Sequence, residues 1–283
     1  MVQVNKKTLN IRGRITNLDT PLVMGILNIT TDSFFAGSRV VSYDQLLDRA
    51  GEMVREGAGI IDIGGYSTRP GAADIDASEE SDRVESAVAP LNKYFPELII
   101  SVDTFRSVVA RRAVEAGAHI VNDVSGGDLD GEMFDTVAEL KVPYVLMHMR
   151  GTPQTMNQMT VYRQLVTDIL IDLKQKVDSL RDKGVTDILI DPGFGFAKTT
   201  GQNFILMHHL SEFELLGYPI LVGISRKAAI YKTLDITAEE ALNGTTVLNT
   251  IALQNGASVL RVHDVKAAVE AVKLWMSTAN FMN

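Results

Sequence analysis

Three polar side chains, Asp103, Asn122 and Asp191, each follow or end a short run of apolar residues. Their shared chemistry is hydrogen bonding to a flat heterocycle that carries several N–H groups. A carboxylate accepts two parallel bonds from an amidine-like edge, and its charge strengthens both of them. An amide donates and accepts at the same time. Each of the three also suits a helix cap or a loop contact, an alternative that weakens when the three are taken together.

A second group of residues, nearer the end of the chain, is cationic. Ser225-Arg226-Lys227 and Arg261-Val262-His263 place four potentially positive side chains after two further apolar runs. Positive groups concentrated in one place allow an acidic protein to hold a phosphorylated or pyrophosphorylated ligand, and helix N-termini would add N–H donors. The alternative is a solvated charged surface. It is less attractive because Arg261 and His263 alternate along one strand and so point the same way.

Two weaker signals complete this set. Asn28 ends the first apolar run, and its side-chain oxygen is a candidate ligand for Mg²⁺, which takes few protein ligands and completes its shell with water and phosphate. The stretch Gly193-Phe194-Gly195-Phe196 allows the backbone to approach a ligand and offers a ring for stacking, although an ordinary turn against the core fits it equally well. The sequence contains no zinc-like spacing, Ser-His-Asp set or Walker glycine loop.

The elements expected to position these groups are eight apolar runs that alternate with amphipathic segments. Parallel strands buried on both faces give continuous apolar runs. Eight of them predict an α/β fold, a (β/α)₈ TIM barrel with its reacting groups at the C-terminal strand ends. A doubly wound open sheet would show similar alternation. The runs are 22–27, 60–61, 98–102, 119–121, 144–147, 188–190, 219–224 and 259–260.

Helix signals fall between the runs. Polar residues that can cap an N-terminus stand at the expected starts, and glycines stand at several expected ends. The starts are Ser42 (a capping box with Gln45), Ser78, Thr104, Thr237 (a capping box with Glu240) and Asp264, and the glycine stops are Gly57, Gly117 and Gly256.

Composition narrows the class of protein. The chain has 283 residues, 46% of them hydrophobic and 22% charged, which predicts one globular domain over residues 1–283. The net charge of −8 argues against a nucleic-acid partner, which needs a basic surface. There are no cysteines, so disulfides, thiolate metal sites and cysteine nucleophiles are excluded. Without a signal-peptide core or a run long enough to cross a membrane, a soluble cytoplasmic protein with no membrane partner is expected.

The motifs are specific enough to indicate a family. From about residue 22 to residue 275 the chain resembles dihydropteroate synthase, a pterin-binding enzyme. A single matching segment could occur by chance, but chance does not explain eight segments in the right order, each at an expected strand end. They are MGILNITTDSF (24–34), GGYSTRPG (64–71), SVDTF (101–105), VNDVSGG (121–127), MHMRGTP (147–153), DPGFGF (191–196), GISRK (223–227) and RVHDV (261–265).

The resemblance implies a (β/α)₈ barrel, usually a homodimer, that acts in folate biosynthesis and is the sulfonamide target. The implied reaction joins two small molecules, 6-hydroxymethyl-7,8-dihydropterin pyrophosphate and para-aminobenzoate, into 7,8-dihydropteroate, with release of pyrophosphate. Positioning and electrostatics would carry this chemistry, since no basic nucleophile of the protein is required.

The resemblance also assigns roles to residues. It implies that the pterin is bound by Asp103, Asn122, Asp191 and Lys227, in a slot lined by Met147 and Phe196. It implies that Asn28, Arg261 and His263 hold the pyrophosphate with Mg²⁺. Thr68, Arg69 and Pro70 would lie on a mobile loop that closes over para-aminobenzoate together with the loop bearing Phe34. Among these residues, Lys227, Asp103 and Arg261 are expected to act in catalysis.

Four residues depart from the common pattern of the family, and all lie near the expected mobile loops or the para-aminobenzoate side. Thr31 stands where proline is usual and Ala36 where an aspartate is frequent, while Tyr66 replaces a frequent glutamate and Ala228 a frequent serine. Two alternatives therefore stay open: a pterin-dependent methyltransferase that transfers a methyl group to a corrinoid, and a pterin-binding module without catalysis. A methyltransferase needs no pyrophosphate site. The residues that favour the synthase over it are Thr68-Arg69-Pro70, Lys227, Arg261 and His263.

Overall fold

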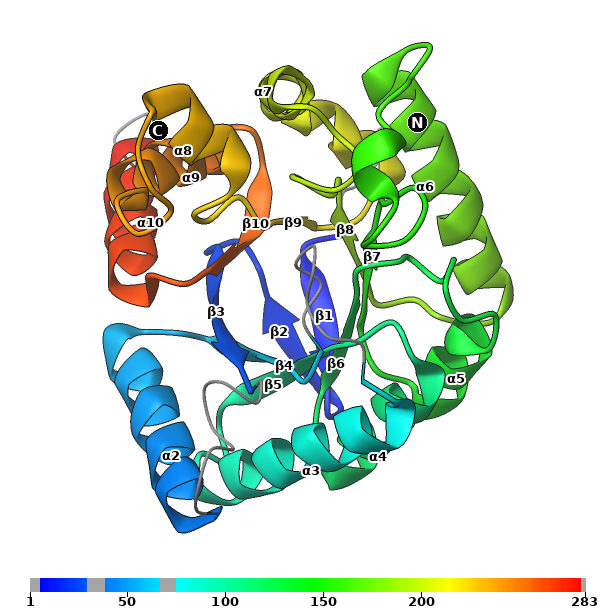
Figure 1. Cartoon of the computed structure of the whole chain (residues 1–283), viewed down its shortest axis with the longest axis vertical. Coiled ribbons are helices and arrows are strands. Elements are labelled where there is room, and N and C mark those ends of the chain that lie inside the picture. Colours follow the sequence, from blue (N-terminus) through cyan, green and yellow to red (C-terminus); the bar gives the residue numbers. More distant parts are fainter. Residues whose placement is uncertain (1–5, 30–38, 67–74, 281–283) are drawn as a thin grey trace.

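The computed structural model describes residues 6–29, 39–66 and 75–280. Within this part of the chain, eight parallel strands close into a barrel in the order β10-β3-β4-β5-β6-β7-β8-β9 (Figure 1). The predicted (β/α)₈ barrel is therefore confirmed, and the open sheet is excluded because the last strand pairs with the first. The strands are β3 (Leu22–Asn28), β4 (Ile60–Gly64), β5 (Ile99–Asp103), β6 (Ile120–Asp123), β7 (Tyr144–Met147), β8 (Ile188–Asp191), β9 (Ile220–Val222) and β10 (Ala257–Val262).

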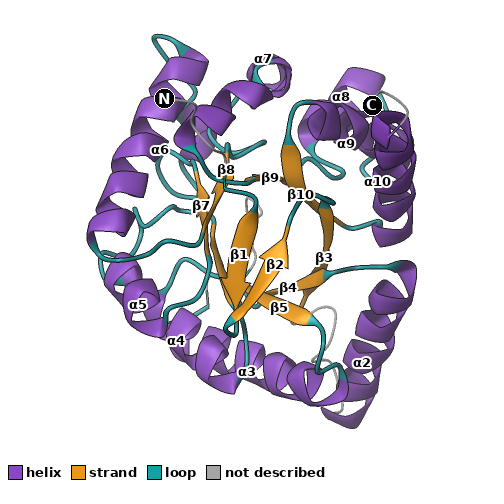
Figure 2. Ribbon diagram, turned by 180° about the vertical axis from the view of Figure 1, so that it is seen from behind, coloured by secondary structure: helices purple, strands orange, loops and turns teal. Residues whose placement is uncertain are grey.

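Helices surround the strands on the outside of the barrel (Figure 2). Most helices that are neighbours along the chain pack side by side, and α10 also contacts α2, so the layer of helices surrounds the barrel. The helices are α2 (Arg39–Glu56), α3 (Ala77–Tyr94), α4 (Ser107–Ala116), α5 (Met133–Leu140), α6 (Leu165–Asp182), α7 (Thr200–His208), α8 (Ala228–Leu234), α9 (Leu242–Gln254) and α10 (Val265–Asn280), with short 3₁₀ turns η1 (Met156–Gln158) and η2 (Leu210–Leu216). None of the helices in the described ranges is long and apolar enough to span a membrane.

Some helix starts differ from those predicted. Helix α2 begins at Arg39, so Ser42 lies inside the helix and not at its N-cap. The N–H of Thr237 does bond to Glu240 Oε2 at 2.9 Å, yet α9 begins only at Leu242. Short-range capping signals identify a turn but do not decide whether the following residues are helical.

Other starts and ends are set by neighbouring side chains. Asp76 caps α3 by accepting the N–H of Glu79, two residues before the predicted Ser78. Thr104 does not cap α4, which begins at Ser107 with Arg106 at its N-cap; the Thr104 hydroxyl donates to Glu80 in α3 at 2.7 Å and accepts the N–H of Arg106 at 3.2 Å. Gly57 and Gly117 end α2 and α4 as predicted, both with positive φ.

An antiparallel hairpin, β1 (Thr8–Ile11) and β2 (Arg14–Asn17), precedes the barrel and was not predicted. Its buried side chains pack against residues from the starts of the barrel strands, in a cluster of Leu9, Ile11, Leu18, Met24, Ile60, Ile120, Val145, Leu189, Leu221 and Val259. This packing closes the N-terminal end of the barrel with apolar side chains. The chemistry is therefore left to the opposite end, where the strands stop.

Candidate active site

Strand alternation places the predicted polar residues inside the barrel mouth. In β4, Ile60 belongs to the inner cluster, whereas Ile61 and Ile63 belong to the core between strands and helices. Successive side chains of a strand point to opposite faces, so Asp62 points inward like Ile60. The same alternation turns inward the polar residues that end the other strands: Asn28, Asp103, Asn122, Asp191, Arg261 and, beyond β10, His263.

Arg261 stands at the centre of the site and joins three strands. Its Nε donates to Asp62 Oδ2 at 2.6 Å, and its Nη2 donates to Asp103 Oδ2 at 2.6 Å. Asn122 Nδ2 also donates to Asp62 Oδ2, at 2.9 Å. These bonds bring together groups from β10, β4, β5 and β6. Asp103, Asn122 and Arg261, expected at one mouth, are in direct or shared contact there.

Asp62 is the residue that sequence reasoning left out of the site. It is fully buried, and its Oδ1 is one of the described buried oxygens that have no hydrogen-bond partner. The signal was present, since Asp62 directly follows the apolar run 60–61 in the same way that Asp103 and Asp191 follow theirs. Its position between Arg261 and Asn122 makes it a support for both residues.

The charges in this cluster are coupled. Burial raises the pKa of Asp103 to about 7; Arg261 opposes this shift, and the nearby carboxylate of Asp62 adds to it. Burial disfavours the charge on Arg261, but attraction by Asp62 and Asp103 outweighs it and raises the pKa of the guanidinium further above its usual value. Arg261 therefore remains charged at every physiological pH, whereas the protonation of Asp103 depends on what binds beside it.

Asp191 and Lys227 form the second part of the site. Asp191 is buried, and its Oδ1 accepts the N–H of Gly193 at 2.7 Å. The ammonium group of Lys227 donates to the carbonyl oxygen of Phe194 and lies 4.4 Å from the centre of the Phe196 ring. Burial lowers the pKa of Lys227 to about 8, although Asp191 opposes this shift. The segment Asp191–Phe196 is thus wrapped around the lysine.

Glycines allow the two parts to approach each other. A Cβ on Gly223 would lie 3.9 Å both from Arg261 Cβ and from Asp191 Oδ2, so these two side chains flank the same glycine. A Cβ on Gly195 would lie 3.0 Å from Lys227 Cδ, which shows how closely the backbone follows the lysine stem. Glycine is required at Gly195 for its positive φ as well.

An apolar wall lines one side of the mouth. Met147 and the ring of Phe196 belong to one buried cluster, together with Phe105, Val124, Leu129, Met149, Met156 and Ala197. The cluster lies beside the polar groups of Asp103 and Asp191, on the same strands and loops. A flat ring with polar edges matches a pocket in which one side is apolar and the other is lined by carboxylates.

The remaining groups lie at the ends of β3, β9 and β10. His263 Nδ1 contacts Ser225 Oγ at 3.1 Å, which links these two neighbouring loops. Asn28 Oδ1 lies 2.9 Å from the position that a Cβ on Gly64 would occupy, and Asp103 Oδ2 lies 4.0 Å from the same point. Among the described residues, no three His, Cys, Asp or Glu side chains are grouped as a metal site.

Arg226 does not take part in the site, contrary to the expectation of four cations there. Its guanidinium forms a bidentate ion pair with Asp264, with both N–O distances at 2.8 Å. It also donates to the carbonyl oxygens of Ala238 and Glu239. Arg226 therefore connects the 235–241 segment to the start of α10. The carboxylate of Asp264, predicted as a helix cap, is used in this ion pair.

Comparison with known proteins identifies the family. The pterin binding enzyme family matches residues 24–263 of this chain. The dihydropteroate synthase of Synechocystis is 44% identical over 255 residues, which cover 89% of this chain and 88% of the relative. The dihydropteroate synthase of Escherichia coli is 39% identical over 269 residues, which cover 94% of this chain and 95% of the relative. The chain belongs to the dihydropteroate synthase family of pterin-binding enzymes.

Solved structures of dihydropteroate synthases share the whole fold. The Yersinia pestis enzyme, in complex with a sulfonamide drug, superposes with a TM-score of 0.90 at 39% identity, covering 96% of this chain and 99% of the other. The Xanthomonas albilineans enzyme, in complex with 7,8-dihydropteroate, gives a TM-score of 0.85 at 35% identity, covering 97% and 99%. The resemblance seen in the sequence motifs is thereby confirmed.

Several residues that the dihydropteroate synthase motifs single out lie outside the described ranges. They are Phe34, Thr68, Arg69 and Pro70, together with the departures Thr31 and Ala36. Two other departures are described. Tyr66 packs edge-on against Phe105 with ring centres 5.2 Å apart, and Arg106 lies over its ring at 5.2 Å. Ala228 is the first residue of α8, directly after Lys227.

Proposed function

We propose that this protein is a dihydropteroate synthase that joins 6-hydroxymethyl-7,8-dihydropterin pyrophosphate to para-aminobenzoate, giving 7,8-dihydropteroate and pyrophosphate in folate biosynthesis. The observation that carries the proposal is the convergence of carboxylate, amide and cationic groups at one barrel mouth, in a chain that belongs to this family. The groups that converge are Asp62, Asp103, Asn122, Asp191, Lys227 and Arg261.

The hydrogen bonds within the site leave acceptors in place for a pterin. Asp191 uses Oδ1 for the N–H of Gly193, so Oδ2 on the side of Gly223 accepts from the amino-pyrimidine edge of the ligand. Asn122 donates Nδ2 to Asp62, which orients its Oδ1 as an acceptor for another ring N–H. Lys227 donates to ring acceptor atoms, and Met147 and Phe196 contact the ring faces.

The pyrophosphate group is assigned to the side of the mouth formed by Asn28, Arg261 and His263. The planar guanidinium of Arg261 matches the geometry of phosphate oxygens. It has five N–H donors, so it can bind a phosphate while it stays hydrogen-bonded to a carboxylate. His263 donates one hydrogen bond even when it is neutral. The net charge of the protein is −8, so binding of an anion depends on the positive groups at this place, and the pyrophosphate would neutralise them.

The residues present also fit Mg²⁺. Asn28 Oδ1 lies 2.9 Å from the Cβ position above Gly64, and an amide oxygen is a donor that this ion takes together with phosphate and water; Asp103 Oδ2 lies 4.0 Å from the same point and already accepts from Arg261. When bound with the pyrophosphate, the ion would neutralise charge on the leaving group. Asn28 would hold it directly, and Asp103 would stand beside it.

The reaction requires positioning more than protein nucleophiles. The bond between the exocyclic methylene carbon and the pyrophosphate oxygen breaks, and the amine nitrogen of para-aminobenzoate forms a new bond to that carbon and then loses a proton. Arg261 and His263 stabilise the negative charge that develops on the departing oxygen. Asp103, Asn122 and Asp191 hold the ring so that the methylene carbon faces the second substrate.

The deciding experiment supplies both substrates with Mg²⁺ and follows pyrophosphate release and dihydropteroate formation. We expect both products in equal amounts, and neither product when one substrate is omitted. Pterin binding without turnover would support a binding module in place of an enzyme. Methyl transfer from a methylated pterin to a corrinoid, without pyrophosphate release, would support a methyltransferase.

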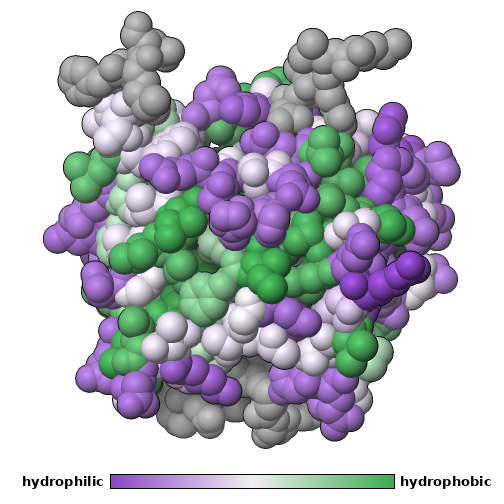
Figure 3. Space-filling view, turned by 90° about the horizontal axis from the view of Figure 1, so that it is seen from above, coloured by the Kyte–Doolittle hydropathy of each residue, from purple (hydrophilic) through white to green (hydrophobic). Residues whose placement is uncertain are grey.

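We further propose that the protein is a homodimer that associates through the face formed by α7, α8 and α9. These helices contact one another, and apolar side chains on them are exposed by 36 to 50%: Phe204, Ile205, Leu234, Val247, Leu242 and Ile251. Seen from the side of α7 and α8, a band of hydrophobic residues crosses the molecule (Figure 3). A second copy would cover such a band, which is larger than scattered exposed apolar residues.

Sedimentation analysis of the double variant Val247→Asp, Ile251→Asp tests this assignment. Two buried charges at a symmetric interface should convert a dimer into monomers. The control is Val108→Asp on α4, which is also 50% exposed but lies elsewhere on the barrel. A wild type that sediments as a monomer, or a double variant that remains dimeric, would refute this interface.

A further inference from the structure

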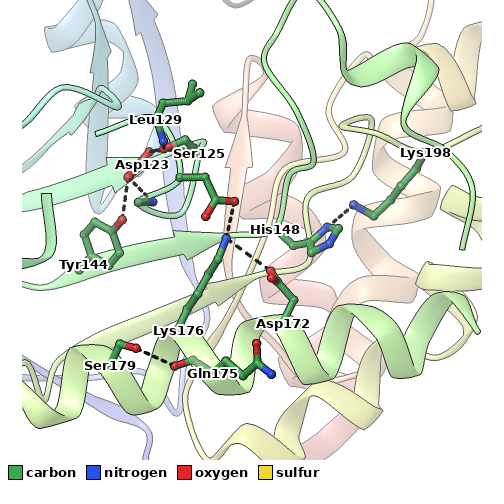
Figure 4. Close-up of polar contacts among 12 residues, drawn as sticks. Asp123, Ser125, Leu129, Tyr144, His148, Asp172, Gln175, Lys176, Ser179 and Lys198 are labelled. Carbon is green, nitrogen blue, oxygen red and sulfur yellow. Dashed lines mark hydrogen bonds and ion pairs between the residues drawn. The ribbon is translucent and has the colours of Figure 1, made fainter. Parts of the chain in front are cut away.

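A second lysine, Lys198, lies buried behind the proposed pterin pocket. Only 8% of it is exposed, and its Nζ contacts three neutral acceptors: Gly193 O at 2.9 Å, Phe196 O at 3.0 Å and His148 Nδ1 at 3.0 Å. Figure 4 shows the contact between His148 and Lys198. A charged amine is costly to bury unless its donors are satisfied, and here three donors meet three acceptors.

Gly193 is held at both its N–H and its carbonyl group. Its N–H donates to Asp191 Oδ1 at 2.7 Å, while its carbonyl oxygen accepts from Lys198 and from the N–H of Phe196 at 3.1 Å. Gly193 has a φ of +76°, and a Cβ there would lie 1.9 Å from the carbonyl oxygen of His148. The backbone of Gly193 is thus fixed between the Asp191 carboxylate and Lys198.

His148 connects the lysine to the neighbouring strand. The backbone N–H of His148 donates to the carbonyl oxygen of Asp191 at 3.0 Å, and the His148 ring, which follows β7, is fully buried. Burial and the adjacent positive charge of Lys198 lower the pKa of His148 to about 2, so the ring is neutral and Nδ1 is an acceptor. Burial lowers the pKa of Lys198 to about 7, which Asp191 opposes.

We propose that Lys198 is a positioning residue for pterin binding: by holding Gly193 O, Phe196 O and His148 Nδ1 together, it fixes the Asp191 carboxylate and the Phe196 ring in the geometry that accepts the pterin. This inference rests on the proposed function, since it assigns a support to the same pocket. It predicts that Lys198 affects ligand affinity without touching the ligand. The Lys198 amine would thus position both the Asp191 carboxylate and the Phe196 ring.

The test compares Lys198→Met, which keeps the length and the apolar stem, with Lys176→Met. Lys176 is a matched control, because it also lies mostly buried, 12% exposed as a side chain, and pairs with Asp172 (Figure 4) and Asp128 instead of with Gly193, Phe196 or His148. The measurements are the Kd of 6-hydroxymethylpterin by calorimetry, the KM for para-aminobenzoate at saturating pterin pyrophosphate, and the thermal midpoint.

We expect Lys198→Met to raise the pterin Kd by about 10- to 100-fold, the effect of misplacing one or two hydrogen bonds to a charged group. The KM for para-aminobenzoate at saturating first substrate should change by less than about threefold, because the residues that the family resemblance assigns to that substrate, Phe34 and Thr68 to Pro70, are not part of the segment from Asp191 to Phe196. Lys176→Met should leave the pterin Kd within about twofold of wild type. A folded Lys198→Met protein with wild-type pterin affinity would overturn the inference.

A second pair of variants keeps the test decisive if Lys198→Met does not fold. His148→Asn keeps an acceptor near the Nδ1 position, whereas His148→Leu removes it. The inference predicts weaker pterin binding in His148→Leu than in His148→Asn, and equal binding in both would overturn it. Wild type serves as the reference for the proposed function itself: a wild-type protein that binds no pterin refutes the function, whereas an active wild type with unaffected variants refutes only the role of Lys198.

Discussion

Arg261 Nη2 and Asp103 Oδ2 lie 2.6 Å apart across the barrel mouth. Their strands, β10 and β5, are separated by β3 and β4 in the barrel, so this ion pair joins non-adjacent parts of the wall. Both side chains are assigned to ligand binding, one to the pyrophosphate and the other to the pterin. The ion pair therefore connects the region proposed to bind the pyrophosphate with the region proposed to bind the pterin.

Replacement of Arg261 separates these roles. Arg261→Ala removes the guanidinium and should weaken binding of the pterin pyrophosphate by roughly 2–3 kcal/mol, the scale of a charged hydrogen bond. The pterin without pyrophosphate should lose much less affinity. Any rearrangement of Asp62 and Asp103 affects both ligands alike, so the difference between the two losses measures the phosphate contact.

Calorimetry with both ligands, on wild type and Arg261→Ala, checks this prediction. Arg226→Ala is a matched control, because that arginine is also paired with a carboxylate but lies outside the site. Equal losses for the two ligands would mean that Arg261 supports the pocket and that the pyrophosphate site lies elsewhere.

Asp191→Asn tests the pterin pocket directly. The substitution keeps the size of the side chain but places an amide N–H where Oδ2 is expected to accept ligand N–H groups. The mismatch of a buried, charge-assisted bond should weaken pterin binding by about 2–4 kcal/mol while the protein stays folded. Near wild-type affinity in calorimetry, with unchanged circular dichroism, would refute the assigned role.

The barrel and most of the site were predictable because they depend on local patterns. Apolar runs marked the buried strands, and a polar residue at the end of each run marked the mouth. Asp103, Asn122 and Arg261 are brought together by the fold for that reason. The period of two along each strand then places the other inward side chains of that strand once one of them is known to point inward.

The missed features depend on contacts between distant segments. Lys198 lies seven residues beyond Asp191 in a loop, and nothing local shows that its amine turns back onto Gly193. The expected role of Arg226 failed because Asp264, 38 residues away, takes its guanidinium. The β1–β2 hairpin was missed since its short strands are recognisable only by the barrel end that they cover.

Ala228→Ser restores a residue that is frequent in the family, and it should act on the second substrate. Residue 228 is half-buried at the first position of α8, where a hydroxyl can donate to a carboxylate near the helix N-terminus. We expect a change in KM for para-aminobenzoate, or in sulfonamide inhibition, that exceeds any change in pterin affinity. Steady-state kinetics and pterin calorimetry on the same variant decide this, and an effect on pterin affinity alone would place residue 228 on the other side of the site.

Acid should destabilise the protein through His119, which lies at the closed end of the barrel. Its ring is buried, and Nδ1 accepts the N–H of Ile100 at 2.8 Å. Burial, with a smaller contribution from Arg12, lowers the pKa of His119 to about 4 from a usual value near 6.5. Between these two values the unfolded chain binds a proton that the folded protein does not, so stability falls as pH decreases from about 6.5 towards 4.

The substitution His119→Asn removes this proton uptake and keeps an acceptor for the N–H of Ile100. From pH 7.5 to pH 5, wild type should lose about 1–2 kcal/mol more unfolding free energy than the variant, the linkage expected for one buried histidine. Urea unfolding at both pH values measures the difference. Catalytic activity at pH 7.5 serves as the control, because His119 lies at the opposite end of the barrel from the mouth and should leave it unchanged. Parallel losses in the two proteins would show that other groups, and not His119, bind the protons that accompany unfolding in acid.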